Sequence, residues 1–240
     1  MNNGNLRTIL ETCIAPFGLT LTDEMWEKFD AYRALLKEWN EKMNLTAITD
    51  DSEIMVKHFA DSLSLYPYIT GKSSNLCDIG TGAGFPGVPL KIVMPDLSVT
   101  LVDSLSKRLT FLNALVSELG LSGIELVHAR AEDFCRKPGC RDSFEYVTAR
   151  AVAPMNVLLE YCLPAVKPGG KFIAMKGSRD EGSFTYACRR LKAAPIKTES
   201  FTLTGADASF ERTIFIFEKT GPTPPQFPRK AGIPAKNPLC

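Results

Sequence analysis

Short apolar runs alternate with amphipathic segments through the middle of this chain, between residues 76 and 193. Each run is four or five residues long, and most of the segments between the runs repeat their apolar positions every three or four residues. The first pattern predicts buried strands and the second predicts helices. The runs lie at residues 76–79, 99–103, 124–128, 144–148 and 171–175. This alternation is typical of an α/β fold with a parallel sheet covered on both faces.

Two further strands are predicted after residue 193. Residues 198–203 and 212–217 alternate apolar and polar side chains, and they are close enough along the chain to pair antiparallel. A helix is expected before them, over residues 180–193. The complete sheet should therefore contain seven strands, of which the last two form an antiparallel pair.

The first 70 residues show helical patterns only. A short helix is expected over residues 6–17. A long one should start after Thr22 and run to Met43, because Met25, Phe29 and Tyr32 begin an apolar stripe at steps of four and three. A third helix is expected from residue 51 to residue 66. We therefore predict a helical cap over residues 1–70 and a main domain over residues 71–219.

Residues 220–240 have a different composition, since six of these 21 residues are proline. Proline removes a backbone donor, so neither a helix nor a central strand is expected here. Three basic residues have no acidic residue near them in this segment, namely Arg229, Lys230 and Lys236. We expect a Pro-rich basic tail that packs on or near the domain.

The overall composition is ordinary for a globular protein, with 45% hydrophobic residues, 23% charged residues and a net charge of +1. Seven scattered cysteines argue against a disulfide framework, and two histidines disfavour a metal centre. No apolar run is long enough to span a membrane, and no signal peptide is recognised. These features predict a cytoplasmic protein, and a monomer is favoured.

A glycine-rich turn follows the first predicted strand, in the stretch Asp78-Ile79-Gly80-Thr81-Gly82-Ala83-Gly84-Phe85-Pro86-Gly87. Glycines allow a tight turn and a close approach of a ligand to the backbone. The pattern G-x-G-x-x-G and Asp103 about 20 residues later fit a dinucleotide. An acid at the end of the strand fits S-adenosylmethionine (SAM) better, since SAM carries a cationic sulfonium and an ammonium group whereas a pyrophosphate would be repelled.

In an open parallel sheet, ligands bind at the carboxyl ends of the strands. Asp78 is expected near the amino-acid end of SAM and Asp103 near its ribose hydroxyls, with Ala131 and Glu132 beside the adenine. The fourth strand ends at Arg150, where enzymes that methylate exocyclic amines place an Asp/Asn-Pro-Pro-Tyr/Phe stretch. An arginine suits the O6/N7 edge of guanine or a phosphate, and a structural ion pair stays open as an alternative.

Several motifs together resemble the bacterial small-subunit rRNA methyltransferase G family. These stretches, in chain order, are Trp39-Asn40-x-Lys42-Met43-Asn44-Leu45-Thr46, His58-Phe59-x-Asp61-Ser62-Leu63, the glycine-rich turn, Asp103-Ser104 with Lys107-Arg108, Arg150-Ala151-Val152-Ala153, and Arg229-x-x-Gly232-x-Pro234-x-Lys236-x-Pro238. The one departure noted is Phe227, where the family often has tyrosine.

The resemblance implies the class I fold of SAM-dependent methyltransferases and methylation of guanine N7 in the 530 loop of 16S rRNA, at guanosine 527. The SAM contacts that it implies are Gly80, Phe85, Ala131, Glu132 and Arg150, to which the glycine turn adds Asp78, Gly82 and Asp103. Guanine N7 carries a lone pair and no proton, so no acid–base residue is expected. The partner implied is 16S rRNA or a small-subunit assembly particle.

The residues expected to contact RNA are basic or lie beside the strand ends. They are His58, Lys107, Arg108, Arg150, Lys176, Arg229, Lys230 and Lys236. For His58 and Asp61, which share a helix face, a satisfied polar patch is the alternative to a substrate pocket. Three other functions stay open: a small-molecule SAM methyltransferase, a nicotinamide-dependent dehydrogenase, and an RNA-binding protein without activity.

Overall fold

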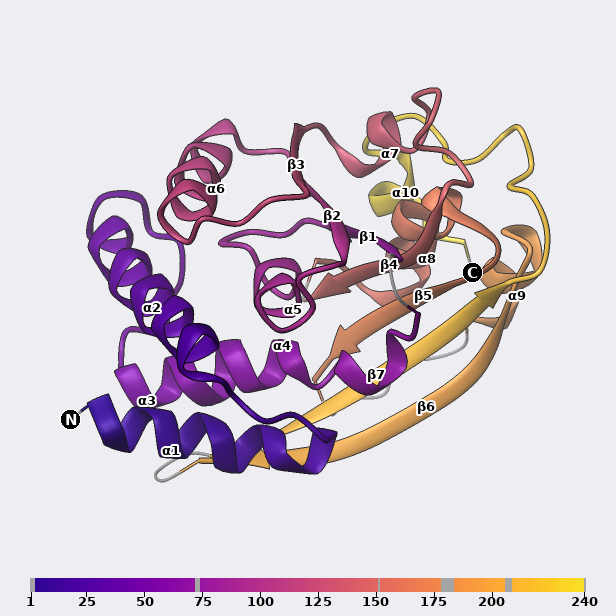
Figure 1. Cartoon of the computed structure of the whole chain (residues 1–240). Helices are drawn as coiled ribbons and strands as arrows, with labels where there is room; N and C mark the ends of the chain where they lie inside the picture. Colours follow the sequence, from indigo (N-terminus) through magenta and orange to yellow (C-terminus); the bar gives the residue numbers. More distant parts are fainter. Residues whose placement is uncertain (1–2, 72–73, 151, 178–183, 206–208, 240) are drawn as a thin grey trace.

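The computed structural model describes residues 3–71, 74–150, 152–177, 184–205 and 209–239. Its centre is a seven-stranded sheet in the order β3-β2-β1-β4-β5-β7-β6 (Figure 1). Strands β1 to β5 are parallel, and β7 runs antiparallel to both β5 and β6. The strands are β1 (Asn75–Ile79), β2 (Ser98–Asp103), β3 (Ile124–His128), β4 (Phe144–Arg150), β5 (Val166–Lys176), β6 (Ala193–Thr204) and β7 (Ser209–Lys219).

This sheet confirms the predicted fold class, including the antiparallel pair at its end. Strands β6 and β7 are longer than predicted, because their pairing continues through residues that are exposed on the edge strand. The helices of the α/β part are α5 (Gly87–Val93), α6 (Ser106–Glu118), α7 (Ala131–Phe134), α8 (Met155–Cys162) and α9 (Thr185–Arg190). The helix predicted over 180–193 is thus shorter, and residues 180–183 lie outside the described residues.

Successive side chains of each strand enter different cores on the two faces of the sheet. On β1, Leu76 belongs to the core shared with α5, α6 and the N-terminal helices, whereas Cys77 belongs to the core shared with α8 and the C-terminal tail. The same alternation separates Ile173 from Phe172 on β5. Both faces are therefore covered, which explains why the strands read as continuous apolar runs.

The N-terminal helices are α1 (Asn3–Ile14), α2 (Asp23–Met43), and a continuous helical segment made of α3 (Asp51–Glu53), the π-helical η2 (Ile54–Ala60) and α4 (Asp61–Leu63). The Thr22 hydroxyl accepts a hydrogen bond from the Met25 N–H, which caps α2 as predicted. In Figure 1, α1 lies along the last part of β6 and the first part of β7, and α2 lies beside α6. The third segment ends at Leu63, three residues earlier than expected.

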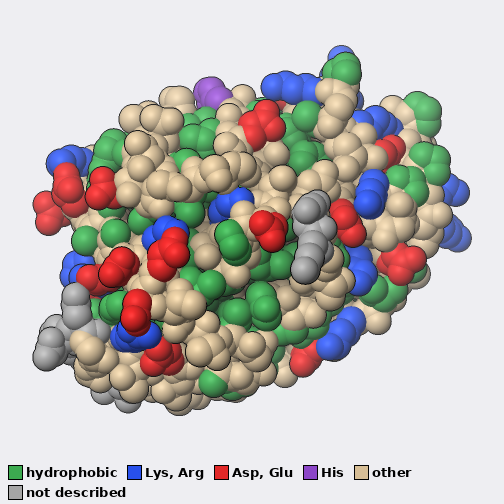
Figure 2. Space-filling view, viewed as in Figure 1, with side chains coloured by type: hydrophobic (Ala, Val, Ile, Leu, Met, Phe, Trp, Pro, Cys, Tyr) green, Lys and Arg blue, Asp and Glu red, His purple; other side chains and the backbone are tan. Residues whose placement is uncertain are grey.

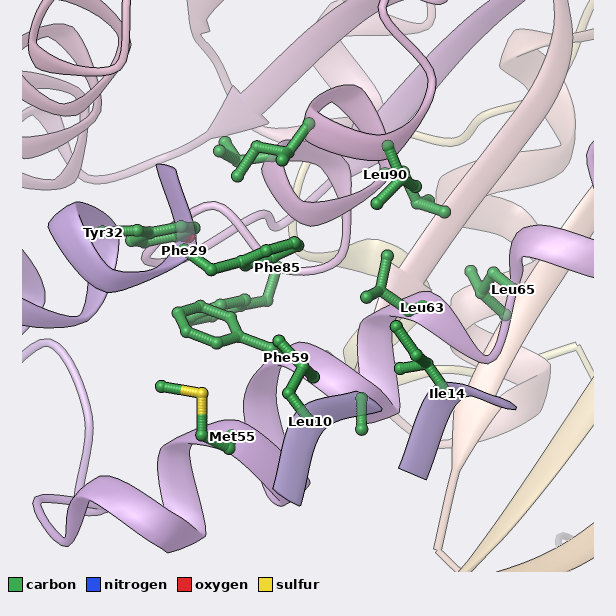
Figure 3. Packing of buried hydrophobic residues seen from close by; sticks show 14 of the residues in the cluster. Leu10, Ile14, Phe29, Tyr32, Met55, Phe59, Leu63, Leu65, Phe85 and Leu90 are labelled. Atoms are coloured by element: carbon green, nitrogen blue, oxygen red, sulfur yellow. The ribbon is translucent and has the colours of Figure 1, made fainter. Parts of the chain in front are cut away.

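Aromatic side chains join these helices to the glycine turn (Figure 3). The rings of Phe29 and Phe59 are 5.0 Å apart, and the ring of Tyr32 stacks on Phe85 at 5.2 Å. The Tyr32 hydroxyl also donates a hydrogen bond of 2.5 Å to the carbonyl of Ala83, inside the turn. The helical cap and the glycine turn consequently share one core.

The tail after β7 packs on α7 and α8, and it ends in a short helix, α10 (Ile233–Lys236). The prediction that the tail contains no helix is therefore wrong for these four residues. Pro234 is tolerated there because it lies in the first turn, where its missing N–H is not needed.

Acidic and basic side chains are interspersed on the face shown in Figure 2, so this face is neither uniformly acidic nor uniformly basic. Within the described residues, no helix is both long and apolar enough to cross a membrane. The same residues contain no group of three or more His, Cys, Asp or Glu side chains arranged to hold a metal ion.

Candidate active site

A cleft of about 580 Å³ lies at the carboxyl ends of β1 to β4, a volume typical of small-molecule sites. Its lining comes from the glycine turn, the strand ends, the N-terminal segment and the helices α6 and α8: Leu45, Thr46, His58, Ile79, Gly80, Thr81, Gly82, Ala83, Phe85, Val102, Asp103, Ser104, Arg108, Ala129, Arg130, Ala131, Glu132, Arg150, Val152 and Tyr161. Seven of the eight residues expected to bind SAM are among them.

The glycine turn needs glycine for two different reasons. Gly80, Gly82 and Gly84 have φ values of 72°, 63° and 99°, in the left-handed region that favours glycine. A Cβ on Gly84 would lie 2.7 Å from the Tyr32 hydroxyl, so this position is closed by packing. A Cβ on Gly82 would meet no atom within 4 Å. Gly82 therefore faces open space in the cleft, as a close approach of a ligand to the backbone requires.

Asp78 is the eighth predicted cofactor residue, and the structure does not put it on the cleft wall. Its side chain is fully buried, and its Oδ2 accepts hydrogen bonds from the Thr81 hydroxyl at 2.7 Å and the Gly87 N–H at 2.9 Å. In the described part of the chain, Oδ1 has no hydrogen-bond partner. Burial raises the pKa of Asp78 to about 6. The carboxylate thus fixes both ends of the glycine turn, and its expected direct contact with SAM stays a prediction.

Asp103 ends β2 and lines the cleft, as predicted. Its carboxylate accepts hydrogen bonds from the N–H groups of Gly82 and Leu105, both at 2.9 Å, and from Arg108 Nη1 at 3.1 Å. These bonds link the end of β2 to the glycine turn after β1. Arg108, predicted as an RNA contact, is thus engaged with Asp103 while it also lines the cleft.

The third strand end carries Arg130, Ala131 and Glu132. Glu132 is buried, and its Oε1 accepts a hydrogen bond of 2.8 Å from the N–H of Gly232 in the tail. Arg130 is exposed and lines the cleft. Arg130 was not predicted as a site residue from the sequence, although its position directly before Ala131 could have indicated that it lines the cleft.

The basic residues of the tail separate into two groups. The guanidinium of Arg229 pairs with both carboxylate oxygens of buried Glu160, at 2.6 to 3.0 Å, and its backbone N–H binds the same carboxylate. Arg229 therefore anchors the tail through an ion pair that the sequence did not indicate, and its contact with RNA stays a prediction. Lys230 and Lys236 are exposed.

Two more arginines hold the tail through its backbone. Arg136 donates to the carbonyl of Pro228, and Arg141 donates to the carbonyls of Thr223, Pro224 and Phe227. The polar loop before β4 thus supplies side-chain donors to backbone carbonyls of the proline-rich tail, in addition to backbone bonds within the tail such as that from Phe227 N–H to the Pro224 carbonyl.

Arg150 joins the N-terminal helices to the end of β4. Its Nη1 donates to Asp61 Oδ2 at 3.0 Å and to the Lys57 carbonyl at 3.1 Å, and its guanidinium lies 4.8 Å from the Phe85 ring centre. Asp61 is fully buried and also accepts two bonds from Arg212, at 2.6 and 2.7 Å. The structural ion pair left open in the sequence exists, and Arg150 lines the cleft as well.

His58 stands between this ion cluster and the cleft. Its ring stacks on Phe85 at 4.5 Å, its Nδ1 is 3.2 Å from Arg150 Nη2, and its Nε2 is 2.8 Å from Thr46 Oγ1. Burial and the charge of Arg150 lower its pKa to about 3. Asp61 is thus a satisfied buried group, one of the two alternatives for this helix face, whereas His58 lines the cleft and its part in a substrate pocket stays a prediction.

The remaining RNA candidates, Lys107 and Lys176, lie at or shortly after strand ends and are not in the cleft lining. Lys107 is exposed, and its Nζ is 3.5 Å from the carbonyl of Met43. Lys176 donates to the carbonyl of Ala153 at 2.7 Å, just after β4. Contact with RNA stays a prediction for these two residues, as it does for Arg108, Lys230 and Lys236.

Comparison with known proteins agrees with this geometry. The family described as rRNA small subunit methyltransferase G matches residues 25–212. A ribosomal RNA small subunit methyltransferase G from Acetivibrio thermocellus is 49% identical over 98% of this chain and 97% of its own length. The protein of the same name from Desulfitobacterium hafniense is 51% identical over 92% of both chains.

Solved structures share the fold at low sequence identity. Precorrin-6y C5,15-methyltransferase from Geobacter metallireducens has a TM-score of 0.52 at 14% identity, over 67% of this chain and 86% of its own. M. jannaschii TYW2, solved in complex with AdoMet, has a TM-score of 0.50 at 14% identity, over 63% of this chain and 72% of its own. With a class I methyltransferase sheet, a glycine turn open to a ligand and full-length relatives near 50% identity, the chain belongs to the rRNA small subunit methyltransferase G family of SAM-dependent enzymes.

Proposed function

We propose that this enzyme transfers the methyl group of SAM to N7 of a guanosine in the 530 loop of 16S rRNA, guanosine 527. The observation that supports N7 best is that the ionisable groups of the cleft are already engaged in hydrogen bonds within the protein. Asp103 accepts three hydrogen bonds, Glu132 accepts a bond from the tail, and both ring nitrogens of His58 have partners. A nucleophile without a proton needs none of these groups as a base.

An exocyclic amine would make a different demand. It loses a proton during methylation, and enzymes supply an acceptor for it within hydrogen-bond reach. At the end of β4 this chain has Arg150, a donor whose guanidinium is bound to Asp61. The cleft thus favours a ring nitrogen with a free lone pair, for which catalysis rests on proximity and orientation.

The residues that would hold SAM are Gly80, Gly82, Phe85, Asp103, Ala131, Glu132 and Arg150. The open space at Gly82 and the carboxylate at the end of β2 fit a ligand with a ribose and no phosphate. When bound, SAM supplies an electrophilic methyl on a sulfonium. The chain's own part is to hold the two reactants in line and to exclude water from between them.

The partner that we propose is 16S rRNA, either free or within a small-subunit assembly particle. The enzyme would bind it as a monomer in the cytoplasm. Lys107, Lys176, Lys230 and Lys236 are the proposed phosphate contacts, with Arg130 added on the evidence of its place at the cleft. Phosphate contacts make affinity fall as salt rises, by a slope of about 0.7 to 0.9 per contact.

Two measurements test this proposal. Titration calorimetry with SAM and with NAD should give heat with SAM only. Methyl transfer from labelled SAM to 16S rRNA and to small-subunit particles should then modify one guanosine, and borohydride reduction followed by aniline cleavage should map it as N7-methylguanine. Binding of NAD, or a methyl group at another base atom, would contradict the proposal.

A further inference from the structure

Thr46 lies in the loop after α2, in the Asn44-Leu45-Thr46 stretch, which the proposed methyl transfer does not use. Its backbone N–H donates a hydrogen bond of 2.8 Å to Asn40 Oδ1 at the end of α2. Its side chain lines the cleft. Thr46 is consequently held by the helix before it and reaches the site from outside the strand ends.

The hydrogen-bonding state of His58 follows from its neighbour. A guanidinium can only donate, so the contact from Arg150 Nη2 at 3.2 Å requires an unprotonated Nδ1 on His58. A neutral imidazole then carries its proton on Nε2. The low pKa of His58 agrees with a neutral ring. Nε2–H therefore donates to Thr46 Oγ1, 2.8 Å away.

A second donor reaches the same oxygen. The backbone N–H of Ile48 donates to Thr46 Oγ1 at 3.0 Å. A hydroxyl has two acceptor lone pairs and one proton, so both lone pairs are occupied. Among the described residues, no acceptor is found for the remaining proton. The hydroxyl is thus restricted to donating, and the cleft is where an acceptor can meet it.

We propose that Thr46 is a specificity-determining residue that donates this proton to O6 of the target guanine. The inference rests on the proposed function, methylation of guanine N7. On that edge of the base guanine presents two acceptors, N7 and O6. N7 uses its lone pair to form the bond to the methyl group, so O6 is the acceptor that remains for a hydrogen-bond donor.

The restriction to donating gives the hydroxyl its selectivity. A free threonine hydroxyl can donate or accept and so tolerates either purine. Adenine presents an N6 amine where guanine has O6, and this amine would face a hydroxyl that has no lone pair to offer. The expected SAM contacts come from the glycine turn and the strand ends, whereas Thr46 enters the cleft from the N-terminal segment, which leaves it for the other reactant.

The test combines protein variants with base analogues at the target position of the rRNA. 2-Aminopurine lacks O6 and keeps N7, whereas hypoxanthine keeps both and serves as the matched control. Thr46→Val removes the hydroxyl with little change of shape, and Thr46→Ser keeps it. Readouts are kcat/KM for the RNA and the Kd of SAM.

Wild-type enzyme should lose about 30-fold in kcat/KM on 2-aminopurine RNA and less than threefold on hypoxanthine RNA, in the range of one lost hydrogen bond to a buried acceptor. For Thr46→Val, kcat/KM on guanine RNA should fall about 30-fold, and replacing the guanine by 2-aminopurine should lower it little further. Thr46→Ser should retain activity and the preference for O6. The Kd of SAM should stay within twofold throughout.

Three results would overturn the inference. Wild-type enzyme could methylate 2-aminopurine as fast as guanine, the losses from Thr46→Val and from 2-aminopurine could multiply, or Thr46→Val could weaken SAM binding as much as activity. The first result needs no variant, so the test survives a Thr46→Val protein that does not fold. Failure of the proposed function is distinct, since wild-type enzyme would then leave N7 of guanine unmethylated.

Discussion

On the glycine-turn side of the cleft, the contacts are local in sequence, whereas on the N-terminal side they join distant residues. The bonds that fix the turn, from Thr81 and Gly87 to Asp78 and from Gly82 to Asp103, span 3 to 21 residues. The bonds from Arg150 and Arg212 to Asp61 span 89 and 151 residues. The first side depends on two carboxylates that bind groups nearby in the sequence, and the second depends on one buried carboxylate that binds two distant arginines.

The strongest test of this difference is Asp61→Ala. It would leave Arg150 and Arg212 close together without their shared anion, and removing one partner of a buried ion pair costs about 3 to 5 kcal/mol. Urea unfolding should show that loss. Asp51→Ala is the control, since Asp51 also binds two cations but is partly exposed, and it should cost less than about 1 kcal/mol. Equal losses would mean that the cluster does not support the N-terminal side.

Asp78→Asn should change how stability depends on pH. The raised pKa of Asp78, about 6 against an ordinary 3.8, means that the folded state keeps a proton that the unfolded chain has released. The stability that this proton contributes is present below pH 3.8 and is lost as the pH rises through 6. The variant cannot ionise, so its unfolding free energy relative to wild type should rise by about 3 kcal/mol between pH 4 and pH 7.5. A constant difference across this range would contradict the raised pKa.

Gly82→Val tests the open space of the turn. The added side chain would occupy the approach to the backbone, and we expect SAM affinity to fall about 100-fold, or roughly 2.8 kcal/mol. Gly120→Val is a matched control, because Gly120 has a similar φ of 58° and equally open surroundings outside the cleft. It should lose stability through backbone strain and keep SAM affinity. Similar affinity in both variants would refute the site.

The smallest effects are expected in the tail, where the loss of Arg229 should affect SAM binding and the loss of Lys230 and Lys236 should affect rRNA binding. Arg229→Ala should release the tail from Glu160, disturb Glu132 through Gly232 and lower SAM affinity about tenfold, or about 1.4 kcal/mol. Lys230→Ala combined with Lys236→Ala should leave SAM affinity unchanged and reduce the salt slope of rRNA binding by about 1 to 2. If Arg229→Ala keeps full SAM affinity, the tail does not support the cofactor side.

The features that could be predicted from the sequence are those encoded in short stretches. The strand runs, the cap at Thr22 and the glycine turn each depend on residues that are neighbours in the sequence, and Asp103 is found from its distance to the turn. Asp78 shows the limit of such reasoning. Its place at the end of β1 was correct, but the turn itself decides that its side chain points inward, toward Thr81 and Gly87.

Partners far apart in the chain could not be predicted. Nothing near Arg229 indicates Glu160, and nothing near Asp61 indicates Arg212, because each pair forms only when the complete fold brings two elements together. The proposed role of Thr46 was harder still to predict. Its action as a donor depends on which ring nitrogen of His58 carries the proton, and that depends on Arg150. The sequence identified the motif, and only the hydrogen-bond geometry indicates its chemistry.

The attachment of the tail to Glu132 also bears on the order in which the molecule folds. The tail leaves β7, and its contacts to Glu160 and Glu132 close loops of 69 and 100 residues. Contacts between distant residues require loop closure and form slowly, so we expect them to follow the pairing of the sheet. The cofactor side of the cleft would then be completed in one of the last folding steps. Recovery of SAM binding during refolding should accordingly lag behind the recovery of β-sheet signal.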